Sequence, residues 1–160
     1  MGVASGPLPD LHNYNINGVA SPGARIHNVR ATGGSTGIEI NTCHGAEISN
    51  FVAINMRGPY PRGQCFQCGD SDNVILEDFY CTSDNTSWTE DNLSLYRSSN
   101  VTVRRGLIDG NNSPTGVGVM FEQDDPTKHG GLCEDVDAVH MGDGCFSACK
   151  HTSTPPVACE

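Results

Sequence analysis

The sequence is poor in aromatic residues, in positive charge and in long apolar runs. Aromatic residues make up 6% of the chain, and 9 Lys and Arg stand against 19 Asp and Glu, so the formal net charge is -10 at pH 7. So few cations argue against a surface for nucleic-acid phosphates. No run is apolar enough to span a bilayer, and residues 1–7 lack the basic and apolar regions of a signal peptide. We therefore expect a mature or excised segment that binds neither nucleic acid nor membrane.

Glycine and cysteine are abundant. The 19 glycines and a hydrophobic content of 36% in 160 residues are typical of a thin core with many turns, and no change of composition marks a second domain. We expect one domain over residues 1–160. An even number of cysteines favours an oxidising compartment, and hence a secreted or extracellular protein. The eight are Cys43, Cys65, Cys68, Cys81, Cys133, Cys145, Cys149 and Cys159.

Short alternating runs recur along the chain. Each has an apolar residue, a polar or small residue and a second apolar residue, which is typical of a strand with one buried face. The runs are Tyr14-Asn15-Ile16, Ile38-Glu39-Ile40, Phe66-Gln67-Cys68, Leu93-Ser94-Leu95 and Val117-Gly118-Val119. Their last members are 24, 28, 27 and 24 positions apart. A period of this length predicts stacked repeats.

A second family of apolar runs follows the first. Its copies begin at Ile26, Ile48, Leu76, Val103 and Val136. The second, third and fourth copies start 8 positions after the end of the preceding run, the first starts 10 after it and the fifth 17 after it. The last spacing implies an insertion of 9 residues across Gln123 to Cys133. Length therefore varies between the strands.

A polar column accompanies these two families, because Asn28, Asn50 and Asp78 occupy equivalent positions in successive repeats. Stacked Asn side chains can hydrogen-bond along a solenoid axis, and Asn and Asp tolerate the left-handed backbone of a sharp corner. A β-sandwich also has many short strands, but its turns recur roughly every 8–12 residues with no longer period. The pattern therefore predicts an all-β fold, a right-handed single-stranded parallel β-helix of about five to six coils over residues 14–148. A Cys-rich irregular end is expected over residues 142–160.

The pattern resembles the pectin-lyase-like right-handed β-helix superfamily over roughly residues 14–148. The resemblance implies the fold and leaves the activity open, because this scaffold carries lyases, hydrolases, epimerases and non-catalytic surface proteins. Family members usually have more coils and capped ends. No amphipathic helix is predicted to cap the first coil here, so we expect either a fragment or end-to-end self-association.

One segment is similar to a motif of pectate lyases. Arg57-Gly58-Pro59-Tyr60-Pro61-Arg62 follows their Arg-x-Pro-x-x-Arg pattern, whose first Arg is assigned as the base that removes a sugar ring proton next to a carboxylate. The resemblance implies Arg57 or Arg62 as the catalytic base of a lyase that cleaves an acidic polysaccharide by β-elimination. The alternative interpretation is a solvated turn whose prolines fix its shape.

The residues between the apolar members should form outward columns. On the first strand these are Asn15, Glu39, Gln67, Ser94 and Gly118, and beside them Asn17, Asn41, Gly69, Tyr96 and Met120. On the second strand they are His27, Ser49, Glu77, Arg104 and Asp137, and beside them Arg30, Val52, Tyr80, Leu107 and His140.

The long connections before the first strand, residues 55–64, 82–92 and 109–115, would wall a groove for a glycan chain, as the resemblance implies. We expect a polysaccharide to be bound there by Glu39 and Gln67, with Tyr60, Trp88 and Tyr96 stacking on sugar rings, although Trp88 can equally cover its own loop.

Carboxylates near this groove suggest a metal. Asp84, Glu90 and Asp91 supply the oxygen ligands that Ca²⁺ prefers, and a calcium ion would make the proton next to a uronate carboxylate more acidic. The segment Asp70-Ser71-Asp72-Asn73 is instead interpreted as a turn.

The cysteines allow more than one interpretation. Cys65, Cys68 and Cys81, or Cys133, Cys145 and Cys149 with His151, could hold zinc, although the spacing matches no common zinc module. Cys68 and Cys81 fall on inward columns, where a thiol is a small apolar filler. Disulfides that fix an irregular end are favoured for the C-terminal group, which is Cys133, Cys145, Cys149 and Cys159.

Two functional hypotheses follow from the sequence. The first is a secreted carbohydrate-active β-helix, with the lyase chemistry described above and Ca²⁺ as its cofactor. The second is a non-catalytic structural or glycan-binding module, present as a fragment or as a subunit of a stacked assembly.

Overall fold

A computed structural model describes residues 14–56, 63–84, 89–111, 113–150 and 158–159. Within these residues the regular structure is strand only. The strands are β1 (Tyr14–Val19), β2 (Arg25–Thr32), β3 (Thr36–Asn41), β4 (Glu47–Ile54), β5 (Phe66–Gly69), β6 (Ile75–Thr82), β7 (Leu93–Tyr96), β8 (Val101–Asn111), β9 (Val119–Gln123), β10 (Gly131–Met141), β11 (Phe146–Lys150) and β12 (Ala158–Cys159). The described part of the chain accordingly offers no helix with the length and apolar character needed to cross a bilayer.

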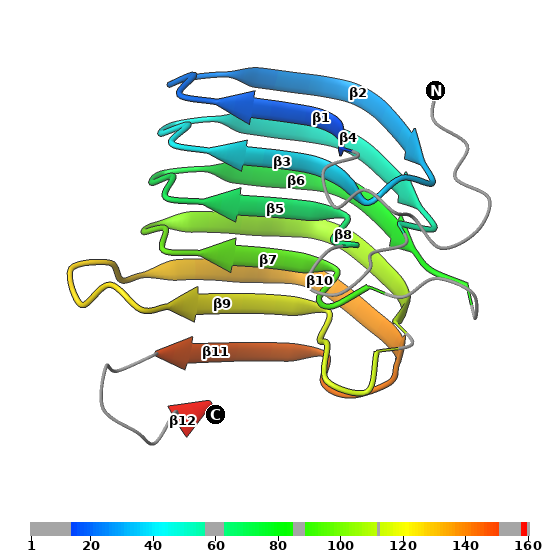
Figure 1. Cartoon of the computed structure of the whole chain (residues 1–160). Helices are drawn as coiled ribbons and strands as arrows, with labels where there is room; N and C mark the ends of the chain where they lie inside the picture. The colour runs from blue at the N-terminus through cyan, green and yellow to red at the C-terminus, as the bar shows by residue number, and fades with distance from the viewer. Residues whose placement is uncertain (1–13, 57–62, 85–88, 112, 151–157, 160) are drawn as a thin grey trace.

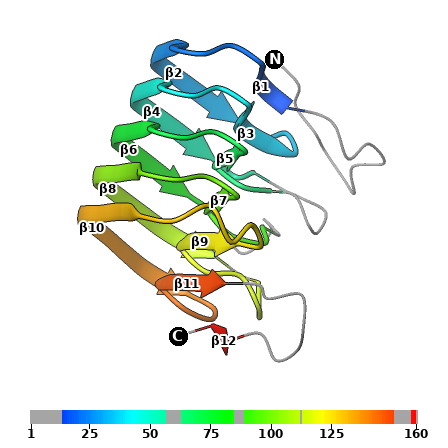
Figure 2. The same cartoon turned by 90° about the vertical axis from the view of Figure 1, so that its left-hand side faces the viewer.

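The strands form two sheets that wind about one axis. The first sheet has the order β1-β3-β5-β7-β9-β11-β12 and the second the order β10-β8-β6-β4-β2. All neighbours pair in parallel except β11 and β12. The odd-numbered strands, followed by β12, stack in one sheet, and β2, β4, β6, β8 and β10 stack in the other (Figures 1 and 2), so the chain is a parallel β-solenoid of about four turns. Its handedness, and the count of five to six coils, stay predictions.

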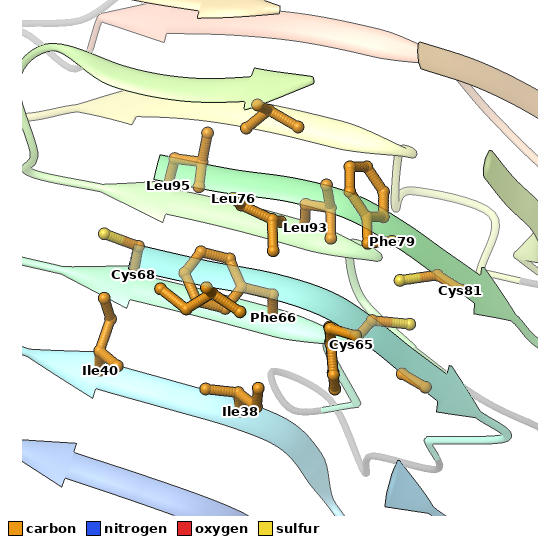
Figure 3. Packing of buried hydrophobic residues seen from close by; sticks show 14 of the residues in the cluster. Ile38, Ile40, Cys65, Phe66, Cys68, Leu76, Phe79, Cys81, Leu93 and Leu95 are labelled. Carbon is orange, nitrogen blue, oxygen red and sulfur yellow. The ribbon is translucent and has the colours of Figure 1, made fainter. Parts of the chain in front are cut away.

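The registers in the middle of the solenoid are those the sequence predicts. Ile40 pairs with Cys68, Cys68 with Leu95, and the same three side chains are fully buried. These residues are 28 and 27 positions apart in the sequence and lie one above another inside the core (Figure 3). The prediction of a vertical apolar column is therefore confirmed.

At the two ends the predicted register of the first sheet is wrong by two residues. Ile16 pairs with Ile38, and Gly18 takes the place opposite Ile40. Similarly, the place opposite Leu95 belongs to Phe121 and not to Val119. Because side chains alternate with a period of two, a shift of two residues keeps the same face inward and leaves the apolar pattern almost unchanged.

The predicted register of the fifth copy of the second run, which was expected to begin at Val136, is also wrong. Cys133 is opposite Val103, and Val136 is opposite Gly106. The spacing from Phe121 to Cys133 is 12 residues, against 8 from Leu95 to Val103, so the insertion is 4 residues and not 9. Glu134, not Asp137, consequently continues the outward column that contains Arg104.

Sharp corners divide the second-sheet strands, as the polar column predicts. Asn28, Asn50 and Asp78 all have a positive φ, between 50° and 58°, and the amide of Asn50 donates to Asn28 Oδ1 at 2.6 Å. The column continues with Arg105, whose guanidinium donates to both Asp78 oxygens at 2.8 and 3.0 Å. The ladder changes there from amide pairing to a bidentate ion pair.

A second ladder, which the sequence analysis did not find, lies inside the corner that follows the first-sheet strands. The Ser71 hydroxyl accepts the Cys43 N–H at 2.8 Å and donates to the Gly69 carbonyl at 2.7 Å. The Ser98 hydroxyl repeats this one coil later, since it accepts the Ser71 N–H at 2.9 Å. Buried polar atoms at the corner are thus paired from coil to coil, which is the condition for a buried loop in a thin core.

The core is packed between the two sheets. Phe66 lies between Ile38 and Leu93 in the first sheet and is fully buried. In the second sheet Phe79 is opposite Gly106, where a β-carbon would lie 2.1 Å from the Phe79 ring. The ring therefore occupies the volume that a side chain at position 106 would need.

The cysteines in the centre act as core residues. Cys65, Cys68 and Cys81 are fully buried beside apolar residues (Figure 3), and burial raises the pKa of the Cys68 thiol to about 12. A thiol in such surroundings stays protonated and behaves as a small apolar group. The core interpretation of Cys68 and Cys81 is confirmed.

Disulfides were expected among the C-terminal cysteines, but Cys133 and Cys145 are free thiols. Cys133 is opposite Val103 near the start of β10, whereas the Cys145 thiol donates to the Ala138 carbonyl further along that strand. The two thiols therefore lie at different points of the last coil, which explains why they do not pair. The side chains of Cys149 and Cys159 lie outside the described residues.

Candidate functional site

The outer face of the first sheet carries a continuous set of polar residues. Glu39, Gln67 and Ser94 are vertical neighbours in one column, and Asn41, Gly69 and Tyr96 in the next. Their flanking partners on the strands, Ile38 and Ile40 among them, are fully buried, so the intervening side chains point away from the core. Glu39, Asn41, Gln67 and Tyr96 are half-buried, whereas Ser94 and Gly69 are buried. We call these six residues the polar face. The structure thus brings together three residues predicted to bind substrate: Glu39, Gln67 and Tyr96.

The ends of these columns differ from the prediction. Asn17 and Met120 continue the column of Glu39, and Glu122 continues that of Tyr96. Asn15 and Gly118 had been expected in the column of Glu39. The two-residue shift at each end is the reason for the change.

Tyr96 is held at the downstream edge of the polar face. Its hydroxyl donates to Asp124 Oδ2 at 2.6 Å, and this hydrogen bond to a carboxylate raises the pKa of the phenol above its usual value. The Arg97 guanidinium lies 5.4 Å from the centre of the Tyr96 ring and donates to Asp70 at 2.9 Å. The ring orientation is therefore fixed by neighbours on both sides, which lowers the entropy cost of binding a ligand against it.

A group of buried polar side chains marks the upstream edge, where the chain enters the first sheet. Gln64 is 1% exposed. Its side-chain oxygen accepts a hydrogen bond from the Thr36 hydroxyl at 3.4 Å, and its side-chain nitrogen donates one to Glu90 Oε2 at 3.5 Å. Asp91, which is 5% exposed, accepts the Val117 N–H at 2.9 Å. Amide and carboxyl groups are thus gathered beside the polar face.

Asp91 has unusual electrostatics for an aspartate. Burial raises its pKa from 3.8 to about 7, the Val117 N–H opposes this rise, and the nearby Glu90 and Glu122 carboxylates add to it. A carboxyl with a pKa near neutrality can exist in both protonation states under ordinary conditions. The sequence analysis singled out Asp91 as a metal ligand, not as a group that titrates.

The predicted calcium ligands are engaged in separate interactions. Asp84 is exposed and exchanges two hydrogen bonds with Asn55, at 2.8 and 3.0 Å, while Asp91 accepts from Val117. Among the residues that the structure describes, no group of three His, Cys, Asp or Glu side chains is placed to hold a metal. Calcium binding at Asp84, Glu90 and Asp91 stays a prediction.

Four of the predicted site residues lie outside the described residues. They are Arg57, Tyr60, Arg62 and Trp88. The catalytic assignment of the two arginines and the stacking role of Tyr60 and Trp88 therefore stay predictions.

Charged pairs on the second sheet join successive coils in a way that the sequence analysis did not predict. Arg104 donates to Glu77 at 2.8 Å one coil away, and Arg105 contacts the same carboxylate at 3.0 Å. These hydrogen bonds lower the pKa of Glu77. The signal that would have found them is the 27-residue spacing from Glu77 to Arg104 and from Asp78 to Arg105.

A hollow of about 560 Å³ lies away from the polar face, at the C-terminal end of the solenoid. Its lining includes Phe121 and Ala148, which are register partners on β9 and β11, and also Lys128 from the inserted segment. Phe121 continues the inward column of Leu95. The hollow is therefore the open end of the core and not a groove across the first sheet.

These features define an all-β parallel solenoid with one polar sheet face. Comparison of the chain with models of known families, with curated proteins and with solved structures found no match.

Proposed function

We propose that the chain is a carbohydrate-binding β-solenoid module that binds a polysaccharide across the polar face. The observation that carries the proposal is the register, which stacks Glu39 on Gln67 and Gly69 on Tyr96 in two adjacent outward columns. The face offers amide, carboxylate and hydroxyl groups for sugar hydroxyls, and an aromatic ring for a sugar ring.

The geometry of the solenoid favours a polymeric ligand. Adjacent parallel strands are about 4.8 Å apart, so equivalent side chains recur at a fixed short interval along the axis. A polymer of repeating sugar units can place successive hydroxyl groups over successive coils. Gly69 has no side chain between Asn41 and Tyr96, and the Asn41 amide lies over it, 3.0 Å from the place of a β-carbon, so a ligand there would contact the Asn41 amide.

The charge of the polar face influences which polysaccharide binds. Glu39 lies on the face and Glu122 and Asp124 lie at its edge, so a uronate polymer would be repelled unless a cation lies between them. We therefore expect neutral glycans to bind without added metal, and acidic glycans to bind only when calcium is present.

The proposal is tested by isothermal titration with neutral and uronate oligosaccharides, with and without calcium. Replacing Gln67 with alanine should weaken binding about tenfold, because a hydrogen bond to the ligand is lost. Thr102→Ala is the matched control, since Thr102 is a half-buried residue of β8 in the second sheet. Equal affinity of Gln67→Ala and wild type for every glycan that binds would contradict the proposed face.

Cleavage of an acidic polysaccharide by β-elimination is the second candidate. It is supported by the resemblance of residues 57–62 to pectate lyases and by Asp91, a buried carboxyl at the entry to the first sheet whose pKa is about 7. Arg57 or Arg62 would act as the base, and Ca²⁺ would bind the uronate carboxylate. Absorbance of unsaturated sugar ends, with pectate, alginate and glycosaminoglycan as substrates, tests this activity. A secreted location accords with both candidates and stays a prediction.

A further inference from the structure

Three asparagines among the described residues stand in the pattern Asn-x-Ser/Thr, in which x is not proline. They are Asn92, Asn100 and Asn111, followed two positions later by Ser94, Thr102 and Ser113. This pattern is the acceptor sequence for N-glycosylation, and an attached glycan must lie on the surface of the folded chain. A fourth copy, Asn85-Thr86-Ser87, lies outside the described residues.

Burial excludes two of these three asparagines. Asn92 is 0% exposed, and its amide donates to the Gly110 carbonyl at 3.2 Å. Asn111 is 1% exposed, and its amide donates to the Glu90 carbonyl and to Asn92 Oδ1, both at 3.0 Å. A sugar on either amide would bring a large polar group into the interior and disrupt these hydrogen bonds. A chain modified at either position could therefore not reach this structure.

Asn100 lies instead at an exposed corner, where β7 is joined to β8 (Figure 1). Its φ is 55°, and its amide nitrogen donates to Oδ1 of Asn73, which occupies the same corner one coil earlier, at 3.3 Å. An amide nitrogen carries two hydrogens, so a sugar can replace one while the other keeps this hydrogen bond. Modification of Asn100 is thus compatible with the fold.

The surface beside Asn100 has room for a sugar. A hollow of about 220 Å³ is lined by Asn100, Val101, Thr102, Gly131 and Leu132. Leu132 is 47% exposed and is opposite Thr102 in the register of β8 and β10. The first sugar of a glycan can lie over these two side chains, and it would cover apolar surface that otherwise contacts water.

We propose that Asn100 carries an N-linked glycan, an inference that rests on the predicted secreted location and is independent of glycan binding by the polar face. The amide nitrogen of Asn100 forms a bond to C1 of an oligosaccharide that is held on a lipid carrier through a diphosphate. The bond between C1 and the diphosphate oxygen breaks, the lipid diphosphate leaves, and the amide proton is released. The lipid-linked donor and the transferring enzyme come from the secretory pathway of the cell, and the Thr102 hydroxyl completes the acceptor pattern.

Expression of the whole chain behind a cleavable secretion signal, in a eukaryotic cell line that attaches N-linked glycans, tests the proposal. The chain is collected from cells and medium together. Trypsin cleaves after Arg97 and Arg104, so residues 98–104 form a peptide that contains Asn100 and none of the other acceptors. This peptide should carry a glycan. Enzymatic removal of the glycan at its amide bond should leave aspartate at position 100, which mass spectrometry detects.

Substitutions at the acceptor pattern provide the controls. Thr102→Ala and Asn100→Gln should each abolish the modification, and Thr102→Ser should retain it, because the hydroxyl is kept. Asn73→Gln is the matched control, since Asn73 occupies the equivalent corner but has Ile75 two positions later, and it should leave the modification unchanged. Thermal melts followed by circular dichroism check that each variant folds.

Two results would overturn the assignment of Asn100. The first is a wild-type chain whose 98–104 peptide carries no glycan, whether or not Asn85 is modified. The second is a glycan on this peptide that Thr102→Ala retains, since the attachment would then not follow the acceptor pattern.

Discussion

Replacing Phe66 with alanine is expected to lower the free energy of unfolding by about 3–5 kcal/mol. Phe66 is fully buried and lies between Ile38 and Leu93 in the stacked registers of β3, β5 and β7. In a thin core between two sheets, the neighbours of a missing ring are tied to their own strands and can relax only partly, so a cavity remains. Urea denaturation of wild type and variant measures the difference.

The same substitution at Phe146 provides the control. Phe146 is 50% exposed at the start of β11, so its removal leaves a much smaller cavity and should cost less than about 1 kcal/mol. If Phe66→Ala cost no more than Phe146→Ala, the ring of Phe66 would not lie in a packed core, and the stacking of coils through it would be wrong.

The second large effect is a dependence of stability on pH that comes from Asp91. The pKa of Asp91 in the folded chain is about 7, above the ordinary 3.8, because burial disfavours the charged form. Below about pH 4 the carboxyl is protonated in both states and imposes no penalty. Between pH 4 and 7 the unfolded chain is increasingly ionised while the folded chain resists ionisation, so wild type loses stability as pH rises.

Asp91→Asn removes this penalty and keeps an oxygen that can accept the Val117 N–H, which Asp91 accepts at 2.9 Å. The variant should match wild type near pH 4 and exceed its unfolding free energy by roughly 2–4 kcal/mol at pH 8, as three pKa units imply at most. Thermal or urea unfolding at several pH values measures the gap. A gap that does not change with pH would show that Asp91 ionises as freely in the folded chain as in the unfolded one.

Asp125→Asn is a control with the opposite sign. The Thr127 hydroxyl and N–H donate to Asp125 at 2.7 and 2.8 Å, and these hydrogen bonds lower the pKa of Asp125 below 3.8. The ionised carboxylate therefore stabilises the folded chain above about pH 4, and that contribution is lost as pH falls through the folded pKa. Its replacement should lower stability at pH 8 and have less effect at acidic pH.

The central coils could be predicted from the sequence because two signals agree there. Ile40, Cys68 and Leu95 give the inward column, and the constant spacing of 8 residues to Ile48, Leu76 and Val103 fixes its phase relative to the next strand. Asn28 and Asn50 mark the corner independently through their tolerance of positive φ. Because the strand pattern and the corner residues agree, only one register between successive coils fits both.

The end coils could not be placed correctly because their pattern is ambiguous. Gly18 is the residue opposite Ile40, but it has no apolar side chain. In the sequence Ile16 is therefore the better apolar match for Ile40, whereas the structure pairs Ile16 with Ile38, two residues earlier on β3. In β10 the corner that matches Asp78 and Arg105 is at Asp135, which has a positive φ, and the apolar residues on either side of this corner have different phases. An apolar alternation continued through that corner therefore aligns Val136 with Val103. In the structure the residue opposite Val103 is Cys133.

The candidate site also has a part that could be predicted from the sequence and a part that could not. Glu39, Gln67 and Tyr96 could be assigned to one face from alternation alone, because strand geometry determines it. The hydrogen bond that Asp91 accepts from the Val117 N–H could not, because Val117 is 26 residues further along in the chain. The same holds for Tyr96 and Asp124, which are 28 residues apart and meet only after the inserted segment is placed.

The central claim is that two stacked columns on the first sheet bind a glycan, and an NMR titration tests it most directly. Amide chemical shifts of the whole chain would be followed as an oligosaccharide that binds is added. The account predicts that the largest changes fall on Glu39, Gln67 and Ser94 and on Asn41, Gly69 and Tyr96, with little change along β4, β6 and β8. Changes confined to the second sheet or to the open end of the core would contradict it.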